Sequence, residues 1–331
     1  MSTRVRWGIL GTGMVAGWLR QGFRGCQKAE LWAVASRSPD RARAFAEKHQ
    51  IPAAHGSYES LLADSSIEAV LVTLPNTLHR EWVERSAQAG KHVLCEKPLA
   101  MSARDVQAMI EACRSQGVHL MEAAMYRFQP QIEGVLQLIR SGRIGQLRHV
   151  QAAFSWPFRD AANIRLRKDM GGGCLFDLGY YPISFAVLLA GRRPAAVMGS
   201  ACYGDSDVEE SAAALLHFDS GLAALAECGF RIDVKIHAEI TGEEGRIILP
   251  DPWTARGNKK QVQVWKARKL DETLEFEDPN AYTREIDHFS GVVRGQGGLL
   301  WTPEESLRVI HTLEAVARSS RTGESVALKP G

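Results

Sequence analysis

The sequence contains no long hydrophobic run and almost no net charge. Its longest charge-free apolar stretch, residues 178–191, is too short to span a bilayer and is interrupted by Pro182. The N-terminal residues enter a strand pattern at once, so we expect no signal segment. Forty basic and 38 acidic residues leave a formal charge of +2, which excludes a global field suited to nucleic acid or to an acidic membrane.

Paired cysteines and metal-ligand clusters are also missing. The six cysteines form no C-x-x-C pair, so we expect reduced thiols in a cytoplasmic protein. No group of Cys, His, Asp or Glu has the spacing of a metal site, so no metal is expected. With 331 residues, 45% of them hydrophobic, the chain is long enough for roughly two domains whose cores need no staples.

Strand and helix patterns alternate over the first part of the chain. The expected strands are short apolar runs separated by helical stretches, at residues 5–10, 31–35, 69–74, 92–95 and 118–122. Repeated β-α-β units indicate a parallel sheet that binds ligands at the carboxyl ends of its strands. We therefore predict an α/β protein whose residues 1–122 form a Rossmann domain with a doubly wound parallel sheet.

A glycine-rich turn follows the first expected strand. Gly11, Thr12, Gly13 and Met14 begin a G-x-G-x-x-A pattern that ends at Ala16, where a helix is expected to start. Gly11 permits the tight turn, and Gly13 lets the backbone approach a pyrophosphate near the free N–H groups of the helix. The pattern predicts a dinucleotide site. The alternative is a plain strand–helix turn that uses glycine for steric reasons.

The end of the second strand bears on the choice between NAD and NADP. An NAD site usually places an acid about 20 residues after the glycine motif, on the ribose 2′-hydroxyl. Here the strand ends at Ser36 and Arg37, with Arg41 behind them, and no acid stands at the tip. Hydroxyl and guanidinium groups can donate to a 2′-phosphate. We expect NADP (NADPH) to be preferred over NAD; the alternative is that Arg37 is a solvated surface charge.

Two charged residues directly follow the strand expected at residues 92–95. Glu96 and Lys97 stand at the sheet edge where a ligand is expected, and Pro98 restricts Lys97 to an extended backbone. The alternative is an exposed ion pair at the strand end.

These motifs together resemble one oxidoreductase family. Residues 11–13 (GTG), 75–79 (PNTLH) and 96–98 (EKP) occur in the order of the glucose–fructose oxidoreductase/inositol dehydrogenase/MocA (Gfo/Idh/MocA) family, and residues 171–181 (GGGCLFDLGYY) resemble its second signature. Residues 121–128 (MEAAMYRF) are similar to the branch with dimeric dihydrodiol dehydrogenases, NADP-dependent D-xylose dehydrogenases and sugar ketoreductases.

The pattern changes to long β-rich segments beyond about residue 145. The expected strands lie at residues 147–155, 197–203, 211–218, 222–230, 235–241 and 246–249, with a hairpin turn at 219–221. We predict that residues 123–331 form an α+β substrate-binding domain with a large, open, mostly antiparallel sheet. The family resemblance implies the same fold and a homodimer or homotetramer formed through that sheet.

Asp177 and Tyr181 are the notable polar residues of the second signature. Asp177 is the only charge in residues 171–191, and a buried carboxylate requires a partner. Because Pro182 is tolerated only near the first turn of a helix, we expect a helix from about Leu178, capped by Asp177, with Tyr181 within one turn. The alternative is a structural cap beside a core tyrosine.

The resemblance implies a mechanism for hydride transfer. The counterpart of Lys97 in related enzymes hydrogen-bonds the reacting oxygen, and the residue at the position of Tyr181 is the usual acid/base. We therefore expect Tyr181 to donate the proton in reduction, Lys97 to polarise the oxygen, and Asp177 to orient Lys97 or a substrate hydroxyl. Free Lys and Tyr both titrate near 10, and the sequence does not decide which of them carries the transferred proton.

Further residues complete the expected site. The cofactor set adds Lys97 and, at the nicotinamide end, Glu96. It also includes residues at and after the end of the strand at 69–74: Thr73, Leu74, Pro75, Asn76 and His79. His79 is equally consistent with a structural role. The substrate set consists of Lys97, Arg127, Trp156, Arg165, Asp177 and Tyr181. For Arg127 and Arg165 the alternative is a surface salt bridge, and for Trp156 it is a place in the core.

The leading function is thus an NADP(H)-dependent oxidoreductase acting on a sugar, cyclic polyol or vicinal diol. A second hypothesis is a family glycosidase that uses tightly bound cofactor in a cycle of oxidation, elimination and reduction. A third is a non-catalytic NADP-binding scaffold. Net consumption of NADPH on a carbonyl substrate separates the first from the other two.

Overall fold

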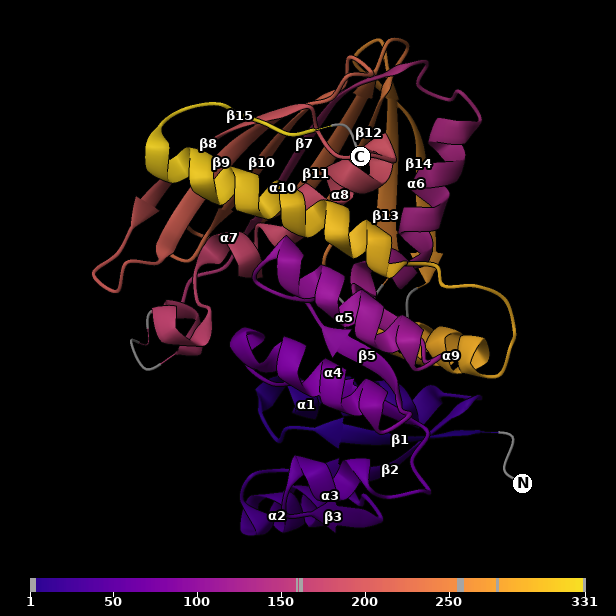
Figure 1. Ribbon diagram of the computed structural model, residues 1–331. Helices are drawn as coiled ribbons and strands as arrows, with labels where there is room; N and C mark the ends of the chain where they lie inside the picture. Colours follow the sequence, from indigo (N-terminus) through magenta and orange to yellow (C-terminus); the bar gives the residue numbers. More distant parts are fainter. Residues whose placement is uncertain (1–3, 159, 161–162, 255–258, 278–279, 330–331) are drawn as a thin grey trace. The chain divides into compact units, whose positions relative to one another are not determined.

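A six-stranded parallel sheet organises the first of two units in this protein (Figure 1). The computed structural model describes residues 4–158, 160, 163–254, 259–277 and 280–329. The sheet order is β3-β2-β1-β4-β5-β6. Its strands are β1 (Val5–Leu10), β2 (Ala29–Ala35), β3 (Ala53–His55), β4 (Ala69–Val72), β5 (His92–Glu96) and β6 (Leu120–Ala123). The order reverses between β1 and β4, so the predicted doubly wound sheet is confirmed, with its switch point beside the glycine-rich turn.

Short helices connect these strands and cover the sheet. They are α1 (Met14–Leu19), α2 (Pro39–His49), α3 (Tyr58–Leu62), α4 (His79–Gln88) and α5 (Ala103–Ser115), with 3-10 turns η1 (Arg20–Gly25), η2 (Asn76–Leu78) and η3 (Met125–Phe128). All four residues of β4 are buried, as a strand covered on both faces requires. Ser38 and Ser57 cap α2 and α3 by accepting backbone N–H groups.

A helix from late in the chain completes the first unit. Helix α9 (Ala281–Val293) packs against η1 and η3. The buried Trp7 indole donates to the Ser290 hydroxyl across 3.0 Å, which ties β1 to α9. The first unit therefore comprises Met1–Ala100, Arg104–Phe128 and Asn280–Ser306, and extends beyond the boundary expected at residue 122. The sequence did not indicate that residues 280–306 rejoin the first unit, because α9 lies far away in sequence from the elements against which it packs.

The second unit is built on a nine-stranded sheet. It comprises Met101–Ala103, Gln129–Pro279 and Leu307–Gly331. The sheet order is β14-β13-β12-β11-β7-β10-β9-β8-β15, and only the β7–β10 pair is parallel. The strands are β7 (Leu147–Ser155), β8 (Ala196–Tyr203), β9 (Glu209–His217), β10 (Ala223–Gly229), β11 (Lys235–Gly242), β12 (Arg246–Leu249), β13 (Lys259–Lys266), β14 (Lys269–Glu277) and β15 (Val326–Ala327). The predicted mostly antiparallel sheet is confirmed, and so is the hairpin at residues 219–221, where the Gly221 N–H donates to the Phe218 carbonyl.

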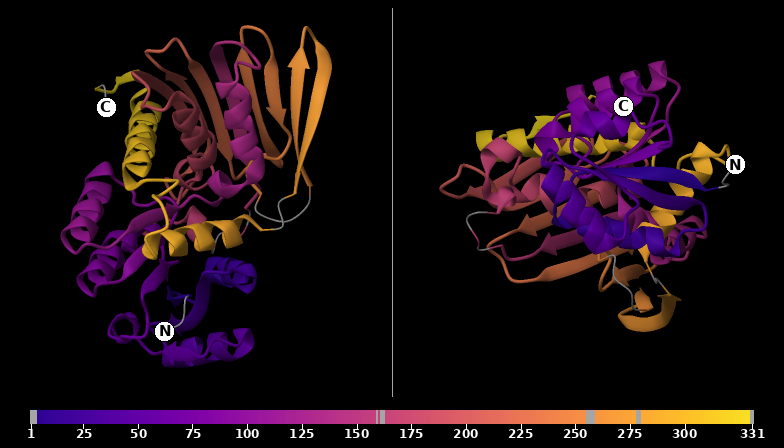
Figure 2. Two further views of the ribbon diagram at one scale, coloured as in Figure 1. Left: turned by 90° about the vertical axis from the view of Figure 1, so that its right-hand side faces the viewer. Right: turned by 90° about the horizontal axis from the view of Figure 1, so that it is seen from below.

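Helices lie over one face of this second sheet (Figure 2). They are α6 (Pro130–Arg140), α7 (Cys174–Asp177), α8 (Tyr180–Ala190) and α10 (Pro303–Thr322). At the start of α10, Thr302 and Glu305 exchange hydrogen bonds in a capping box. No single helix of the described chain is long and apolar enough to cross a bilayer; the segments Lys168–Asp177 and Tyr180–Ala190 reach that length only as a pair bent by 52°.

The ion pair between Glu68 and Arg294 gives the first testable prediction. Hydrogen bonds from the Arg294 guanidinium (2.6 and 2.9 Å) lower the pKa of Glu68. A carboxyl whose pKa is lowered by folding stabilises the protein above its unfolded pKa of about 4.3, and this contribution disappears as the pH falls through the folded value. We expect Arg294→Met to reduce the free energy of unfolding near pH 7 by about 0.2–1 kcal/mol, with a smaller difference in acid.

Urea unfolding at neutral and acid pH measures this effect. Arg43→Met is the matched control, because its pair with Asp40 is highly exposed and should contribute nothing measurable. An equal loss for Arg294→Met at both pH values would contradict the assignment.

Candidate functional site

The glycine-rich turn has the shape that a pyrophosphate group requires. Gly11 has φ +113°, and a Cβ there would lie 2.8 Å from the Thr73 hydroxyl oxygen. Gly13 is exposed with open space around its Cα, and no side chain caps the start of α1. Met14 is 57% exposed, so the turn faces solvent. The backbone at this turn can therefore come close to the pyrophosphate of the dinucleotide that the fold implies, as the sequence pattern predicts.

Polar and cationic groups stand at the end of β2. The Ser36 side chain is buried and its hydroxyl accepts the Ser38 N–H at 3.3 Å. Arg37 is exposed, and its guanidinium opposes the rise in the pKa of Tyr58 that burial causes. Arg41 is also exposed, on the first turn of α2. The end of β2 itself thus carries a cation and no carboxylate, a chemistry suited to a phosphate. The first turn of α2 adds Arg41 and also Asp40, whose carboxylate is paired with Arg43.

The loop after β4 is tied to the loop after β5 through His79. The imidazole is fully buried, with Nδ1 3.0 Å from the Pro98 carbonyl oxygen and Nε2 2.9 Å from the Leu74 carbonyl oxygen. Burial lowers the pKa of His79, while hydrogen bonds to these carbonyls oppose that change. His79 therefore braces both loops. Thr73 donates to the Leu10 carbonyl, and Pro75 and Asn76 are half-buried beside η2.

The turn after β5 is held from its other side by an acid that the sequence analysis missed. Glu96 and Lys97 are half-buried, and the Lys97–Pro98 peptide bond is cis. Glu122, in β6, is fully buried and accepts the Leu99 N–H at 2.6 Å. Its other oxygen accepts the Trp301 indole N–H at 3.1 Å. A glutamate inside the apolar run of β6 was the signal that could have found it, since a buried carboxylate requires donors.

Arg127 is a buried cation at the end of the first unit's sheet. Its side chain lies in η3, 8% exposed, and its Nε and Nη1 atoms have no hydrogen-bond partner among the described residues. Arg127 also makes no ion pair with any described residue. The surface salt bridge considered as an alternative is therefore absent among these residues. Leaving a buried cation unpaired is costly. A ligand oxygen would satisfy it.

Asp177 has found its partner within the second unit. The Arg165 Nε donates to Asp177 Oδ2 at 2.6 Å, and the two side chains are 20% and 16% exposed. The Arg165 guanidinium also lies over the Phe158 ring, 4.7 Å from its centroid. The expected partner for the carboxylate is therefore present, and one alternative for Arg165, a salt bridge, is the arrangement observed.

The expected helix start at Leu178, with Asp177 as its cap, is wrong. Asp177 ends α7, Gly179 is the N-cap of α8, and α8 begins at Tyr180. The break occurs because Leu178 and Gly179 both donate to the Cys174 carbonyl, and a Cβ on Gly179 would lie 2.5 Å from the Leu175 carbonyl oxygen. Pro182 correctly limited where the helix could begin, but the sequence pattern did not indicate the turn at Leu178 and Gly179 between α7 and α8.

The glycine run before α7 positions Arg165. Gly172 donates to the Arg167 carbonyl, Gly173 donates to the Arg165 carbonyl, and both bonds are 2.9 Å long. A Cβ on Gly172 would lie 2.5 Å from the Arg165 carbonyl oxygen. Glycine is thus required for the loop carrying Arg165 to approach this closely.

Tyr181 is half-buried among aromatic rings of the second unit. Its ring centroid lies 5.0 Å from that of Phe154 in an edge-on contact and 6.0 Å from that of Trp253. These contacts fix the direction of the phenol. Trp156 is 45% exposed, so it is not a core residue.

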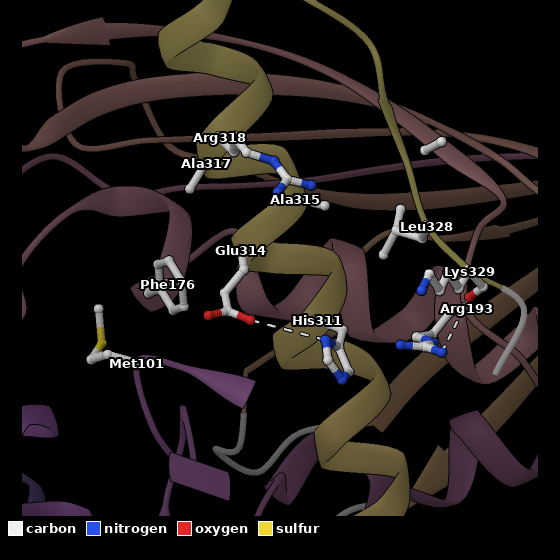
Figure 3. Close-up of a pocket in the computed structure, with 11 residues that line it drawn as sticks. Met101, Phe176, Arg193, His311, Glu314, Ala315, Ala317, Arg318, Leu328 and Lys329 are labelled. Carbon is white, nitrogen blue, oxygen red and sulfur yellow. Dashed lines mark hydrogen bonds and ion pairs between the residues drawn. The ribbon is translucent and has the colours of Figure 1, made fainter. Parts of the chain in front are cut away.

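A separate cavity in the second unit contains none of the predicted site residues (Figure 3). It has a volume of about 610 Å³ and lies beside α10 and the C-terminal strand segment. Arg193, Arg318 and Lys329 line it with His311 and Glu314. It is mixed in charge and lacks the glycine-rich backbone and signature residues described above.

The doubly wound sheet, the open glycine turn and the braced lysine define a Rossmann-fold oxidoreductase that uses a nicotinamide dinucleotide. The chain belongs to the GFO/IDH/MocA oxidoreductase family. Residues 5–124 match the family described as "Oxidoreductase family, NAD-binding Rossmann fold", and residues 132–248 match the "GFO/IDH/MocA C-terminal domain".

Relatives extend over nearly the whole chain. D-xylose 1-dehydrogenase (NADP(+)) 2 of Haloferax volcanii is 36% identical over 90% of this chain and 92% of its own. Trans-1,2-dihydrobenzene-1,2-diol dehydrogenase of Sus scrofa is 30% identical over 87% and 84%. A 3-ketoreductase from Actinomadura kijaniata, solved with NADP and TDP-benzene, has a TM-score of 0.88 and 30% identity over 96% of this chain and 98% of its own. The resemblance to this family and branch is confirmed.

The Arg165–Asp177 pair gives the second prediction. Because both groups are mostly shielded, we expect Arg165→Met and Asp177→Asn each to destabilise the protein and the double variant to lose less than their sum. The expected coupling energy is about 1–2 kcal/mol in a double-mutant cycle measured by chemical unfolding. Strictly additive losses would show that the two side chains do not act as a pair.

Proposed function

We propose that this protein is an NADP(H)-dependent dehydrogenase or reductase acting on a sugar, cyclic polyol or vicinal diol. The observation that carries the proposal is the braced turn at the end of β5, which presents Lys97 on the sheet edge where the dinucleotide is expected. The xylose dehydrogenase, the dihydrodiol dehydrogenase and the ketoreductase above support this substrate class, since each acts on a hydroxyl or carbonyl carbon.

The residues that would hold the cofactor lie in the first unit. The backbone at Gly11, Thr12, Gly13 and Met14 would receive the pyrophosphate, and Ser36, Arg37 and Arg41 would receive the 2′-phosphate. Thr73, Leu74, Pro75, Asn76 and Glu96 would line the path toward the nicotinamide, with His79 bracing that loop. The cationic, carboxylate-free end of β2 supports NADP over NAD.

A bound nicotinamide would supply or accept the hydride. The side chains would bind the reacting oxygen of the substrate and transfer its proton. Lys97 would donate a hydrogen bond to the reacting oxygen. Tyr181 would donate the proton in reduction and accept it in oxidation, acting as a positioned general acid and base. Asp177, fixed by Arg165, would orient a substrate hydroxyl, and Arg127 and Trp156 would contact the rest of the substrate.

The assembly and location are part of the same proposal. Met198 and Leu215 are paired across β8 and β9 and are 55% and 48% exposed, which supports a homodimer or homotetramer formed through the sheet of the second unit. The cysteines Cys26, Cys95, Cys113, Cys174, Cys202 and Cys228 are all free, which supports a cytoplasmic location.

A spectrophotometric screen tests the function. Aldoses, ketosugars, diols and dicarbonyls are offered with NADP(H) and, separately, with NAD(H). The proposal expects a net change in cofactor absorbance with at least one of these classes, and a larger kcat/KM with the NADP couple. Turnover of a substrate without net cofactor change would favour a glycosidase cycle instead.

Lys97→Met should abolish turnover while the affinity for NADPH changes less than about tenfold. The thioether has similar length but cannot donate a hydrogen bond to the reacting oxygen, and an interaction made chiefly in the transition state affects kcat more than binding. Fluorescence titration with NADPH and steady-state kinetics measure the two effects. Lys91→Met is not a suitable control because Lys91 is buried, whereas the exposed Lys48→Met should leave both values unchanged. Unaltered kcat in Lys97→Met would remove Lys97 from the chemistry.

Arg37→Asp should shift the preference from NADP toward NAD. A carboxylate at the end of β2 repels a 2′-phosphate and can accept a hydrogen bond from a ribose hydroxyl. We expect kcat/KM for NADPH to fall at least about tenfold, a loss typical of a charge-assisted hydrogen bond, while the value for NADH changes less. Arg43→Asp, which changes charge equally on the outer side of α2, is the control. Unchanged NADPH kinetics in Arg37→Asp would overturn the cofactor assignment.

A further inference from the structure

The cavity beside α10 has a role neither in the sequence analysis nor in the proposed function. Its volume of about 610 Å³ lies within the range of sites that bind small molecules. All the described residues that line it belong to the second unit (Figure 3). The chemistry of these residues therefore indicates which class of molecule the cavity could hold.

One wall of the cavity is a polar face of α10. His311, Glu314, Ala315 and Arg318 follow one another at spacings of three, one and three residues, so they share one face of the helix. His311 Nδ1 lies 4.0 Å from Glu314 Oε2. The Arg318 side chain is exposed, and its guanidinium makes no hydrogen bond or ion pair with any described residue. Its charge is thus available to a ligand.

Two further cations come from other segments of the second unit. Arg193 follows α8, and Lys329 follows β15. Arg193 Nη2 donates to the Lys329 carbonyl at 3.2 Å, which holds the two residues together (Figure 3). Burial lowers the pKa of His311, and the nearby charge of Arg193 lowers it further. The Arg193 charge therefore acts on the helix wall, and His311 is neutral at pH 7.

Arg193 and Lys329 both retain donors that the fold does not use. Arg193 is half-buried, and its Nε is shielded from solvent with no hydrogen-bond partner among the described residues. The exposed Lys329 ammonium also has no partner in that part of the chain. Shielding a guanidinium nitrogen is costly unless an acceptor reaches it. A ligand oxygen in the cavity would supply that acceptor.

The charges on the walls favour a dianion. Among the described lining residues, three cations (Arg193, Arg318 and Lys329) and one carboxylate (Glu314) leave an excess of two positive charges. A phosphate monoester carries about −1.5 to −2 charges at pH 7 and offers three acceptor oxygens. Guanidinium groups bind such oxygens in pairs, which a carboxylate-poor cavity with two arginines permits.

We propose that this cavity binds a small organic phosphate ester, whose phosphate group lies against Arg193, Arg318 and Lys329. The remaining walls include the apolar side chains of Phe176 and Leu328, which suit the carbon skeleton of such a ligand. None of these residues belongs to the sets proposed for the dinucleotide or for the substrate, so the inference goes beyond the proposed function.

Isothermal titration calorimetry at 150 mM salt tests the proposal. The protein is first saturated with NADP, so that the sites for the phosphates of the dinucleotide are filled. Glycerol 3-phosphate, glucose 6-phosphate and phosphoenolpyruvate are then titrated separately, with inorganic phosphate as the reference anion. We expect at least one of the three esters to bind saturably at one site per chain, at least about tenfold more tightly than inorganic phosphate.

Variants assign the binding to this cavity. Arg193→Gln and Arg318→Gln should each raise the Kd of the bound ester at least about tenfold, the effect of losing a charge-assisted hydrogen bond. Glu314→Gln should lower that Kd about two- to fivefold, because it removes a repelling charge. Arg192→Gln is the matched control: it removes the same charge beside Arg193, but Arg192 is exposed and does not line the cavity.

The Tm of each variant separates binding from folding. Arg193→Gln also removes the bond to the Lys329 carbonyl and could destabilise the protein. Arg318→Gln removes no such contact, so its Tm without ligand should equal that of the wild type. A tenfold loss of affinity in this variant, with unchanged Tm, would therefore support the site whatever the stability of Arg193→Gln.

Four results would overturn the inference: no saturable binding of any of the three esters, inorganic phosphate bound as tightly as the esters, a Kd unaltered in Arg318→Gln, or an equal loss of affinity in Arg192→Gln. None of these measurements requires turnover. Ester binding in a protein that reduced no substrate would leave this site established while the proposed function failed.

Discussion

The structure of the candidate site depends on how one short turn is held at the end of the strand β5. Residues 96–99, at the end of β5, contain two charged residues and a proline. Pro98 restricts the backbone of Lys97 but does not by itself hold the turn in place. The buried Glu122 accepts the Leu99 N–H on one side, and the buried His79 contacts the Pro98 carbonyl on the other. These contacts replace hydrogen bonds to water, so releasing the turn would leave buried polar groups unpaired. The backbone of the turn that carries Lys97 is therefore held by side chains from α4 and β6.

In the second unit, a glycine-rich loop brings Arg165 into contact with Asp177. Asp177 follows an apolar helical segment, and the loop carrying Arg165 must come close enough to meet it. The glycine run makes this approach possible, because a side chain on Gly172 would collide with the Arg165 carbonyl. In both units a charged group of the site is thus held by main-chain contacts to a neighbouring loop.

Local patterns in the sequence predicted much of this arrangement, and its long-range contacts escaped prediction. The strand alternation and the glycine pattern identified the sheet and the dinucleotide turn because each depends on neighbouring residues only. The strands β13 and β14 were missed although both alternate in the sequence, as in β13, where Val262 and Val264 are buried between Gln residues that are exposed or half-buried. Glu122 was missed because its partner Trp301 lies far away in sequence. The turn between α7 and α8 depended on a steric contact at Gly179 that spacing cannot reveal.

This protein moves a hydride between NADPH and a carbon that bears oxygen. The most direct measurement is the fate of deuterium placed on the transferable face of the nicotinamide C4, followed by mass spectrometry of the product from an accepted carbonyl substrate. We expect one deuterium atom bound to carbon in the product for each NADPH consumed. A product that contains no deuterium, or that forms while the reduced cofactor remains undiminished, would contradict it.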